Sequence, residues 1–188
     1  IKKRGKKTGA APGTLVHIGD ISNLITNIHY IRYDQHAVHE QEIVDVNDCV
    51  HENQAQQTGW INIDGLQNPD IIRSIGERFS IHPLVQEDIL NTDHRPKIEV
   101  HHDYLYIVIK MLHFDDQNEC LRSEQVSLIV GDNYLLSFQE HAGDVFNGVR
   151  ERLRAGRKIR ALGPDYLAYA LIDAVVDNYF LLLEKFGD

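Results

Sequence analysis

The chain has 188 residues, of which 43% are hydrophobic and 25% charged, the composition of a soluble globular protein long enough for one domain with a real core. Its net charge is −9 although residues 1–7 hold five lysine and arginine side chains, so the rest of the chain is more acidic still. An acidic body argues against nucleic-acid binding, which needs a basic face, and is compatible with binding of cations.

Motifs of several other protein classes are missing from the sequence. Cys49 and Cys120 are far apart, which fits a reducing compartment and predicts neither a disulfide framework nor a zinc cluster. No secretory signal is visible, and the most apolar stretch, residues 166–183, contains Asp173 and Asp177, which makes a membrane span there unfavourable. Neither GxSxG, HExxH nor a phosphate-binding glycine loop occurs, so we expect the chain not to be an enzyme.

The first half of the chain reads as a basic arm followed by interleaved strands and helices. Residues 1–13, rich in lysine and ending in Pro-Gly, are predicted to form a flexible arm. Alternation of apolar and polar residues predicts strands, at 14–18, 24–33, 38–46 and 60–65. A polar segment, 47–57, reads as a turn and loop. Helix-start signals and helical spacing predict helices over 68–79 and 82–90, with His82 as a cap.

Hairpins dominate the middle of the chain, and helices follow them. Residues 97–100 and 104–112 read as one hairpin, and 125–130 and 134–138 as a second hairpin joined by Gly-Asp-Asn. Gly143-Asp144 is predicted to cap a helix through residue 155, and its partner opens near 157. Early interleaving followed by hairpins favours the α/β (α+β) class, with a mixed sheet between helices on both faces.

The last 25 residues, 164–188, read as one long helix. Proline at its first position suits a helix start, and no glycine or proline interrupts it before residue 187. Its surface is apolar on nearly every side, which predicts burial nearly all round. The exception is a single face that carries four acidic residues at helical spacing, Asp173, Asp177, Glu184 and Asp188. Because like charges at this spacing repel, the stripe needs water, a basic partner, a subunit interface or a cation.

Two acidic features are candidates for cation binding. Glu87 and Asp88 are adjacent on the helix predicted over 82–90, and hard cations prefer oxygen ligands. The alternative for this pair is a solvated helix face. The second feature is the acidic stripe of the helix predicted over 164–188, and its alternative is pairing with lysine or arginine from the body of the domain. The 11 histidines suggest transition metals, but no zinc motif has the required order, so we expect loose surface histidines.

Several long segments, in the right order, resemble the cytoplasmic N-terminal domain of the CorA family of magnesium/cobalt transporters. The segments are IHPLVQEDILNTDHRPKIE, EQVSLIVGDNYLLSFQE, GDVFNGVRERLR and DYLAYALIDAVVDNYFLLLEK. PGTLVHIG near the start and GWINIDGL in the middle match the family as well. The resemblance covers nearly the whole chain.

This resemblance implies an architecture. Members of the family are homopentameric channels whose subunits have an α/β/α cytoplasmic domain with a mixed parallel/antiparallel sheet, a long stalk helix, and two C-terminal transmembrane helices with a GMN signature. We therefore expect a basic arm over 1–13, the α/β/α domain over 14–163 and the start of the stalk helix over 164–188. The chain would be the excised cytoplasmic domain of an inner-membrane protein, in contact with the membrane only through the missing transmembrane helices.

The resemblance also implies a function, namely a sensor of Mg²⁺, or of Co²⁺, that gates transport. The carboxylates that match the family's regulatory sites at subunit interfaces are Glu87, Asp88, Asp173 and Asp177. For Asp88, the family partner is an aspartate on the neighbouring subunit's stalk, beyond residue 188, so only half of this intersubunit site is expected in the chain. Because the membrane helices that help hold the ring are missing, the isolated chain is expected to be a monomer or a weak assembly. Two alternatives are the sensor domain of a related zinc transporter and a stand-alone cytosolic binding or scaffold domain.

Overall fold

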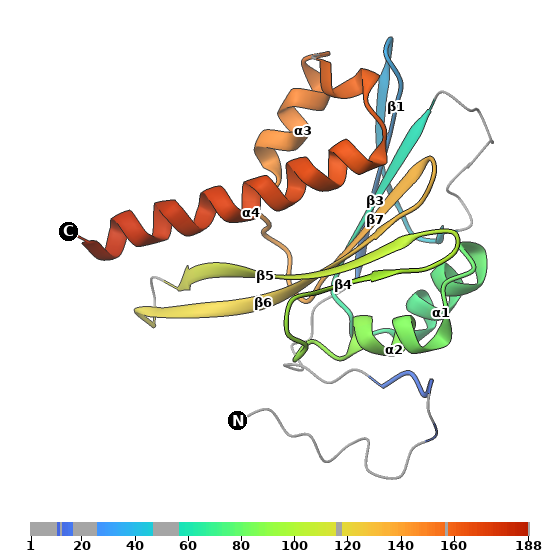
Figure 1. The fold of residues 1–188 in the computed structure, drawn as a ribbon, viewed down its shortest axis with the longest axis horizontal. Coiled ribbons are helices and arrows are strands. Elements are labelled where there is room, and N and C mark those ends of the chain that lie inside the picture. Colours follow the sequence, from blue (N-terminus) through green and yellow to red (C-terminus); the bar gives the residue numbers. More distant parts are fainter. Residues whose placement is uncertain are drawn as a thin grey trace.

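A mixed sheet of seven strands forms the centre of the structure, a computed structural model that describes residues 11, 13–16, 26–46, 57–115, 118–156 and 158–187. The strands are β1 Asn27–Tyr33, β2 Val38–Ile43, β3 Thr58–Asp64, β4 Lys97–Val100, β5 Leu105–Asp115, β6 Cys120–Val130 and β7 Tyr134–Gln139. Their order across the sheet is β2-β1-β3-β7-β6-β5-β4, and only the central β3–β7 pair is parallel (Figure 1).

Helices cover both faces of this sheet. One face carries α1 (Pro69–Arg78) and α2 (Pro83–Leu90), and the other carries α3 (Asn147–Arg154), a short 3₁₀ helix (Lys158–Ala161) and α4 (Pro164–Gly187) (Figure 1). The expected α/β/α sandwich with a mixed sheet is therefore confirmed.

Strand alternation divides the apolar side chains into two cores. In the central strand β3, Ile61 and Ile63 pack against α1 and α2, while Trp60 packs against α3 and α4. Successive side chains of a strand point to opposite faces, so a strand covered on both sides is buried along its length. All the residues of β3 except Asp64 are buried.

Local signals start the two helices of the first face. The Asn68 side chain accepts a hydrogen bond from the Asp70 backbone N–H at 3.1 Å, and the His82 side chain accepts one from Leu84 N–H at 3.2 Å. The prediction that His82 is a cap is confirmed. The two helices pack closely at Gly76 of α1. A Cβ added there would lie 2.1 Å from the Gln86 amide of α2, so a larger residue would clash.

The longest hairpin, formed by β5 and β6, was not predicted as a hairpin, and its strands are longer than the strands predicted over 104–112 and 125–130. Strands β5 and β6 pair over 11 positions, from Leu105 opposite Val130 to Asp115 opposite Cys120. The outer part of β6 could not be recognised as a strand from the sequence, because residues 119–123 are all exposed and do not alternate in burial. The tertiary structure extends the ribbon by placing the C-terminal half of α4 beside β5 (Figure 1).

Two other predicted elements differ from the structure. The helix expected from Gly143-Asp144 begins only at Asn147, and Asp144 instead accepts a hydrogen bond from Phe146 N–H at 2.9 Å and pairs with Arg150. In the strand expected over 14–18, the described residues 14–16 form no strand. Residues 1–10 of the expected arm, and 47–56, lie outside the described residues.

The terminal helix α4 is buried only along its first half. Leu167, Leu171 and Val175 lie in the core, but Phe180 and Leu183 are 60% and 65% exposed, so the expectation of burial all round is wrong. The second half contacts β5 on one side, through hydrogen bonds from the Asn178 amide, at 2.7 Å, and the Tyr179 hydroxyl to backbone carbonyls of β5, and through the ring of Phe186. By length and composition alone, α4 is the one helix of the described chain that could cross a membrane. Its packing on the sheet assigns it to the domain instead.

A chain of hydrogen bonds runs under α3 and α4 at the centre of the sheet. The Trp60 indole N–H donates to Ser137 at 2.9 Å, Ser137 donates to Asn62, and the Asn62 amide donates to Asp64 at 2.9 Å. The Gln139 amide also donates to Asp64. Burial raises the pKa of the Asp64 carboxyl above its usual 3.8, because desolvation outweighs these hydrogen bonds.

We expect Asp64→Asn to remove one pH dependence of stability. With a raised folded-state pKa, the folded protein binds the Asp64 proton more tightly than the unfolded chain does. The contribution of Asp64 to stability therefore falls as the pH rises from 3.8 through the folded-state pKa, and is constant above it. Urea unfolding at a series of pH values should show wild type losing stability relative to Asp64→Asn across this range. A difference that stays constant with pH would contradict the prediction.

Candidate functional site

The first candidate pair, Glu87 and Asp88, lies on the outer side of α2. The helix buries Val85 and Ile89 against the sheet, which leaves the two carboxylates half-buried at its edge. They are neighbours in sequence but have different partners. One oxygen of Glu87 accepts a hydrogen bond from the Gly13 backbone N–H at 2.6 Å, which ties the start of the described chain to α2.

Asp88 is engaged by basic side chains from the segment that follows α2. Its Oδ2 lies 2.6 Å from the Lys97 ammonium, and its Oδ1 lies 3.2 Å from Nε2 of His94. The same ammonium lies 2.7 Å from an oxygen of Glu99. The Asp88 carboxylate is still 25% exposed, so solvent reaches it beside the ion pair. The Asp88 carboxylate is therefore already paired with a positive charge, the Lys97 ammonium.

This basic partner is held firmly in its charged form. Burial opposes the charge on Lys97, but the hydrogen bonds that its ammonium donates to Asp88 and Glu99, together with the attraction of these two carboxylates, outweigh burial and raise its pKa. The same ammonium holds the pKa of the Glu99 carboxyl below its usual range. The Gln125 amide, which bonds to the Asp88 backbone carbonyl at 3.3 Å and to His94 N–H at 3.1 Å, fixes the loop that brings these groups together.

The second candidate pair, Asp173 and Asp177, lies on α4 where that helix faces α3. Both carboxylates line a cleft of about 330 Å³, whose α3 side carries Gly148, Val149 and Arg152. Asp173 is half-buried and Asp177 is exposed. Arg152 is the basic residue of this lining, although no ion pair within 4 Å joins it to either aspartate in the described structure. The face is acidic and open.

The structure does not bring the two pairs together. α2 packs on one face of the sheet and α4 on the other, so Glu87 and Asp88 are separated from Asp173 and Asp177 by the sheet itself (Figure 1). Within the described residues, no group of three or more His, Cys, Asp or Glu side chains could hold a metal ion. The oxygen donors still suit Mg²⁺, which keeps most of its water and usually binds one or two carboxylates. Each pair fits part of a cation site.

Several histidines contact carboxylates, whereas the sequence predicted loose surface histidines. Besides His94, which contacts Asp88, His113 and His141 contact the buried carboxylate of Glu124, at 3.3 and 3.6 Å. The Glu124 carboxylate also accepts a hydrogen bond from His141 N–H at 2.7 Å. This cluster was not predicted from the sequence, although a strand drawn one residue longer would have placed Glu124 on the inward face with Val126.

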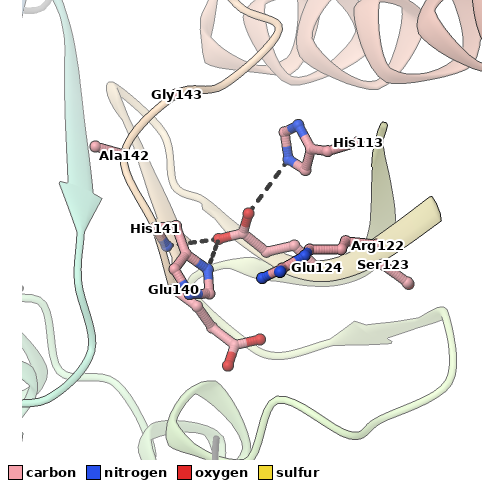
Figure 2. Close-up of a pocket in the computed structure, with 8 residues that line it drawn as sticks. All are labelled: His113, Arg122, Ser123, Glu124, Glu140, His141, Ala142 and Gly143. Carbon is pink, nitrogen blue, oxygen red and sulfur yellow. Dashed lines mark hydrogen bonds and ion pairs between the residues drawn. The ribbon is translucent and has the colours of Figure 1, made fainter. Parts of the chain in front are cut away.

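The Glu124 cluster lines a pocket of about 500 Å³ at the end of β5, β6 and β7. Figure 2 shows His113 and His141 approaching the Glu124 carboxylate from different sides, each toward its own oxygen. A metal centre needs ligands that converge on one point, whereas these two imidazoles lie on either side of one carboxylate. The cluster anchors the loop of residues 140–143.

These features define an α/β/α domain with carboxylate pairs that solvent reaches on helices of both faces. A family model described as "CorA-like Mg2+ transporter protein" matches residues 55–188. The chain belongs to this family of transporters, which agrees with the expectation that it is not an enzyme.

Individual proteins resemble this chain in sequence or in fold. It is 45% identical to the cobalt/magnesium transport protein CorA of Thermotoga maritima over 188 residues, all of this chain and 53% of that protein. The soluble domain of CorA from Methanocaldococcus jannaschii superimposes with a TM-score of 0.62 at 15% identity, over 88% of this chain and 62% of that one.

The ZntB cytoplasmic domain from Vibrio parahaemolyticus gives a TM-score of 0.57 at 11% identity, over 84% of this chain and 63% of that one, which shows a shared fold alone. The chain spans about half the length of its Thermotoga relative, so its roles in transport and in subunit assembly are proposals.

Proposed function

We propose that this chain is the cytoplasmic regulatory domain of a CorA-type Mg²⁺/Co²⁺ transporter in a cell membrane. In this proposal, carboxylates of α2 and α4 lie at interfaces between subunits of a homopentamer, and divalent cations that bind there control the pore. The observation that carries the proposal is the position of Asp88 and of the Asp173–Asp177 pair on outer helix surfaces, in a chain 45% identical to a cobalt/magnesium transport protein.

The charges of the domain give this regulation a physical basis. Carboxylates brought together at an interface repel one another, and this repulsion favours a looser arrangement of subunits. A bound divalent cation supplies the positive charge that offsets the repulsion. Asp88, Asp173 and Asp177 would then stabilise the tighter arrangement, and the cation shifts the gate only by its difference in affinity for the two states.

The exposed side of α4 supports contact with a second copy of the chain. Val176, Phe180 and Leu183 follow one another at helical spacing and are all exposed. An apolar stripe of this kind beside Asp173 and Asp177 suits a helix–helix interface rimmed by charge. The same stripe explains how a helix so apolar in sequence is only half buried in one copy.

Titration of the purified chain with Mg²⁺ tests the assignment of the carboxylates. We expect Mg²⁺ to raise the melting temperature of wild type, with a gain of about 1.4 kcal/mol at ten times the dissociation constant and thus a shift of about 3–6 °C. Asp88→Ala and Asp173→Ala should each reduce this shift, because each removes an oxygen ligand. Calorimetry of the same samples measures the affinity directly.

The matched control is Asp70→Ala, which removes an exposed helix carboxylate paired with Arg73 on α1. It should leave the effect of Mg²⁺ unchanged. If all three variants responded to Mg²⁺ as wild type does, the proposed cation sites would be wrong.

A further inference from the structure

The Lys97 ammonium lies between two carboxylates, one from α2 and one from β4. It lies 2.6 Å from Oδ2 of Asp88 and 2.7 Å from Oε1 of Glu99. Lys97 and Glu99 are two positions apart on β4, so their side chains leave the same face of this edge strand, toward α2. The backbone of β4 therefore sets the spacing of Lys97 and Glu99, and α2 brings Asp88 to both.

Two imidazole rings complete the surroundings of the two carboxylates. Nε2 of His94 lies 3.2 Å from the second oxygen of Asp88, and Nε2 of His101 lies 3.6 Å from the second oxygen of Glu99. Both nitrogen atoms are buried and lack a hydrogen bond of good geometry in the described structure. The groups that surround Lys97 are thus two carboxylates and two imidazoles, and the two carboxylates supply the oxygen atoms that Mg²⁺ prefers.

Charge favours exchange of this ammonium for a divalent cation. With neutral imidazoles, two carboxylates and one ammonium leave a net negative charge, whereas a divalent cation in place of the ammonium would neutralise the pair. Lys97 can leave this position because its side chain is partly exposed, belongs to an edge strand and carries its ammonium on a flexible four-carbon stem, and in leaving it gives up its contact with the Tyr106 ring at 5.3 Å.

We propose that Lys97 is a tethered competitor for the divalent cation at Asp88, and that Glu99 is a second ligand of that cation. The proposal rests on the proposed function in that it takes Asp88 as a cation ligand. While the cation is absent, the ammonium holds Asp88 and Glu99 and limits their repulsion. It must swing away before a divalent cation binds both carboxylates, and this lowers the apparent affinity. Lys97 thereby sets the cation concentration to which the site responds.

Calorimetric titration of the purified chain with Mg²⁺ tests this role of Lys97. We expect Lys97→Met to bind about tenfold more tightly than wild type, because the competing ammonium and its two ion pairs are gone. Lys97→Arg keeps the charge and should bind no more tightly than wild type. The control Lys158→Met removes an exposed lysine on the other face of the sheet and changes the net charge equally, and it should also bind as wild type does.

The outcomes separate this proposal from the proposed function. If Lys97→Met bound as wild type does while Asp88→Ala still lost binding, the competitor role would be wrong and the Asp88 site would stand. If neither wild type nor Lys97→Met bound Mg²⁺, the competitor role of Lys97 and the cation site at Asp88 would both be wrong for this chain. Tighter binding by Lys97→Met that survived Glu99→Gln would exclude Glu99 as a ligand. Circular dichroism checks that each variant folds, and Lys97→Gln provides a polar replacement if the methionine variant does not.

Discussion

Arg150→Met is expected to lower the free energy of unfolding by about 3–5 kcal/mol, because it leaves a buried carboxylate without its partner. The guanidinium of Arg150 bonds to both oxygens of Asp144, at 2.7 and 2.5 Å, and the two side chains are only 10% and 5% exposed. Its guanidinium carbon also lies 5.1 Å from the centroid of the Trp60 ring, where cation and ring attract each other. Urea unfolding followed by tryptophan fluorescence and circular dichroism measures the loss.

The same type of substitution at a surface pair provides the control. Arg154, one turn further along α3, pairs with Glu40 at 2.8 Å, but its side chain is 51% exposed. Arg154→Met should cost less than about 1 kcal/mol, as exposed pairs do. In an Arg150→Met/Asp144→Asn double variant, part of the stability should return, because the uncompensated charge is gone. Equal losses for Arg150→Met and Arg154→Met would show that burial does not govern the Arg150 pair.

Leu171→Ala is expected to lower the free energy of unfolding by about 2–5 kcal/mol, the cost of a cavity in a packed core. Leu171 is fully buried where α4 crosses the centre of the sheet. No solvent reaches its side chain, so its removal leaves space that the rigid sheet beneath fills only in part. Thermal and urea unfolding of the purified chain measure the loss.

Leu183→Ala is the matched control on the same helix. Because Leu183 is 65% exposed, its removal should change stability by less than about 0.5 kcal/mol in a single copy of the chain. If the exposed stripe of α4 contacts a second copy, Leu183→Ala should instead weaken self-association, which sedimentation at several protein concentrations detects. A large loss of stability for Leu183→Ala at low concentration would contradict the division of α4 into a buried and an open half.

Part of the candidate site could be read from the sequence, and part could not. Adjacent carboxylates on a short helix and a four-residue spacing on a long one are local patterns, so Glu87, Asp88, Asp173 and Asp177 could be named in advance. Their partners depend on distant segments. Glu87 meets the backbone of Gly13, 74 residues away, and no sequence period connects the two.

The fold was predictable wherever apolar periodicity was strong. Helix caps and short hairpins depend on neighbouring residues, and the predicted α1, α2, β4 and β7 match the structure within a few residues. The outer half of the β5–β6 hairpin was not predictable, because polar residues there are ordered by pairing with each other and by α4 above them. The start of α3 was misplaced for a related reason, since Asp144 serves the buried Arg150 rather than a helix end.

The sequence by itself therefore determined the class of fold, the order of most elements and the acidic character of two helices, because these depend on short-range periodicity and composition. Only the tertiary structure decided that the sheet separates the two carboxylate pairs, that half of α4 stays open, and that Lys97 lies between Asp88 and Glu99. Those outcomes depend on which elements pack against which face, and packing of this kind is set by burial summed over the whole domain.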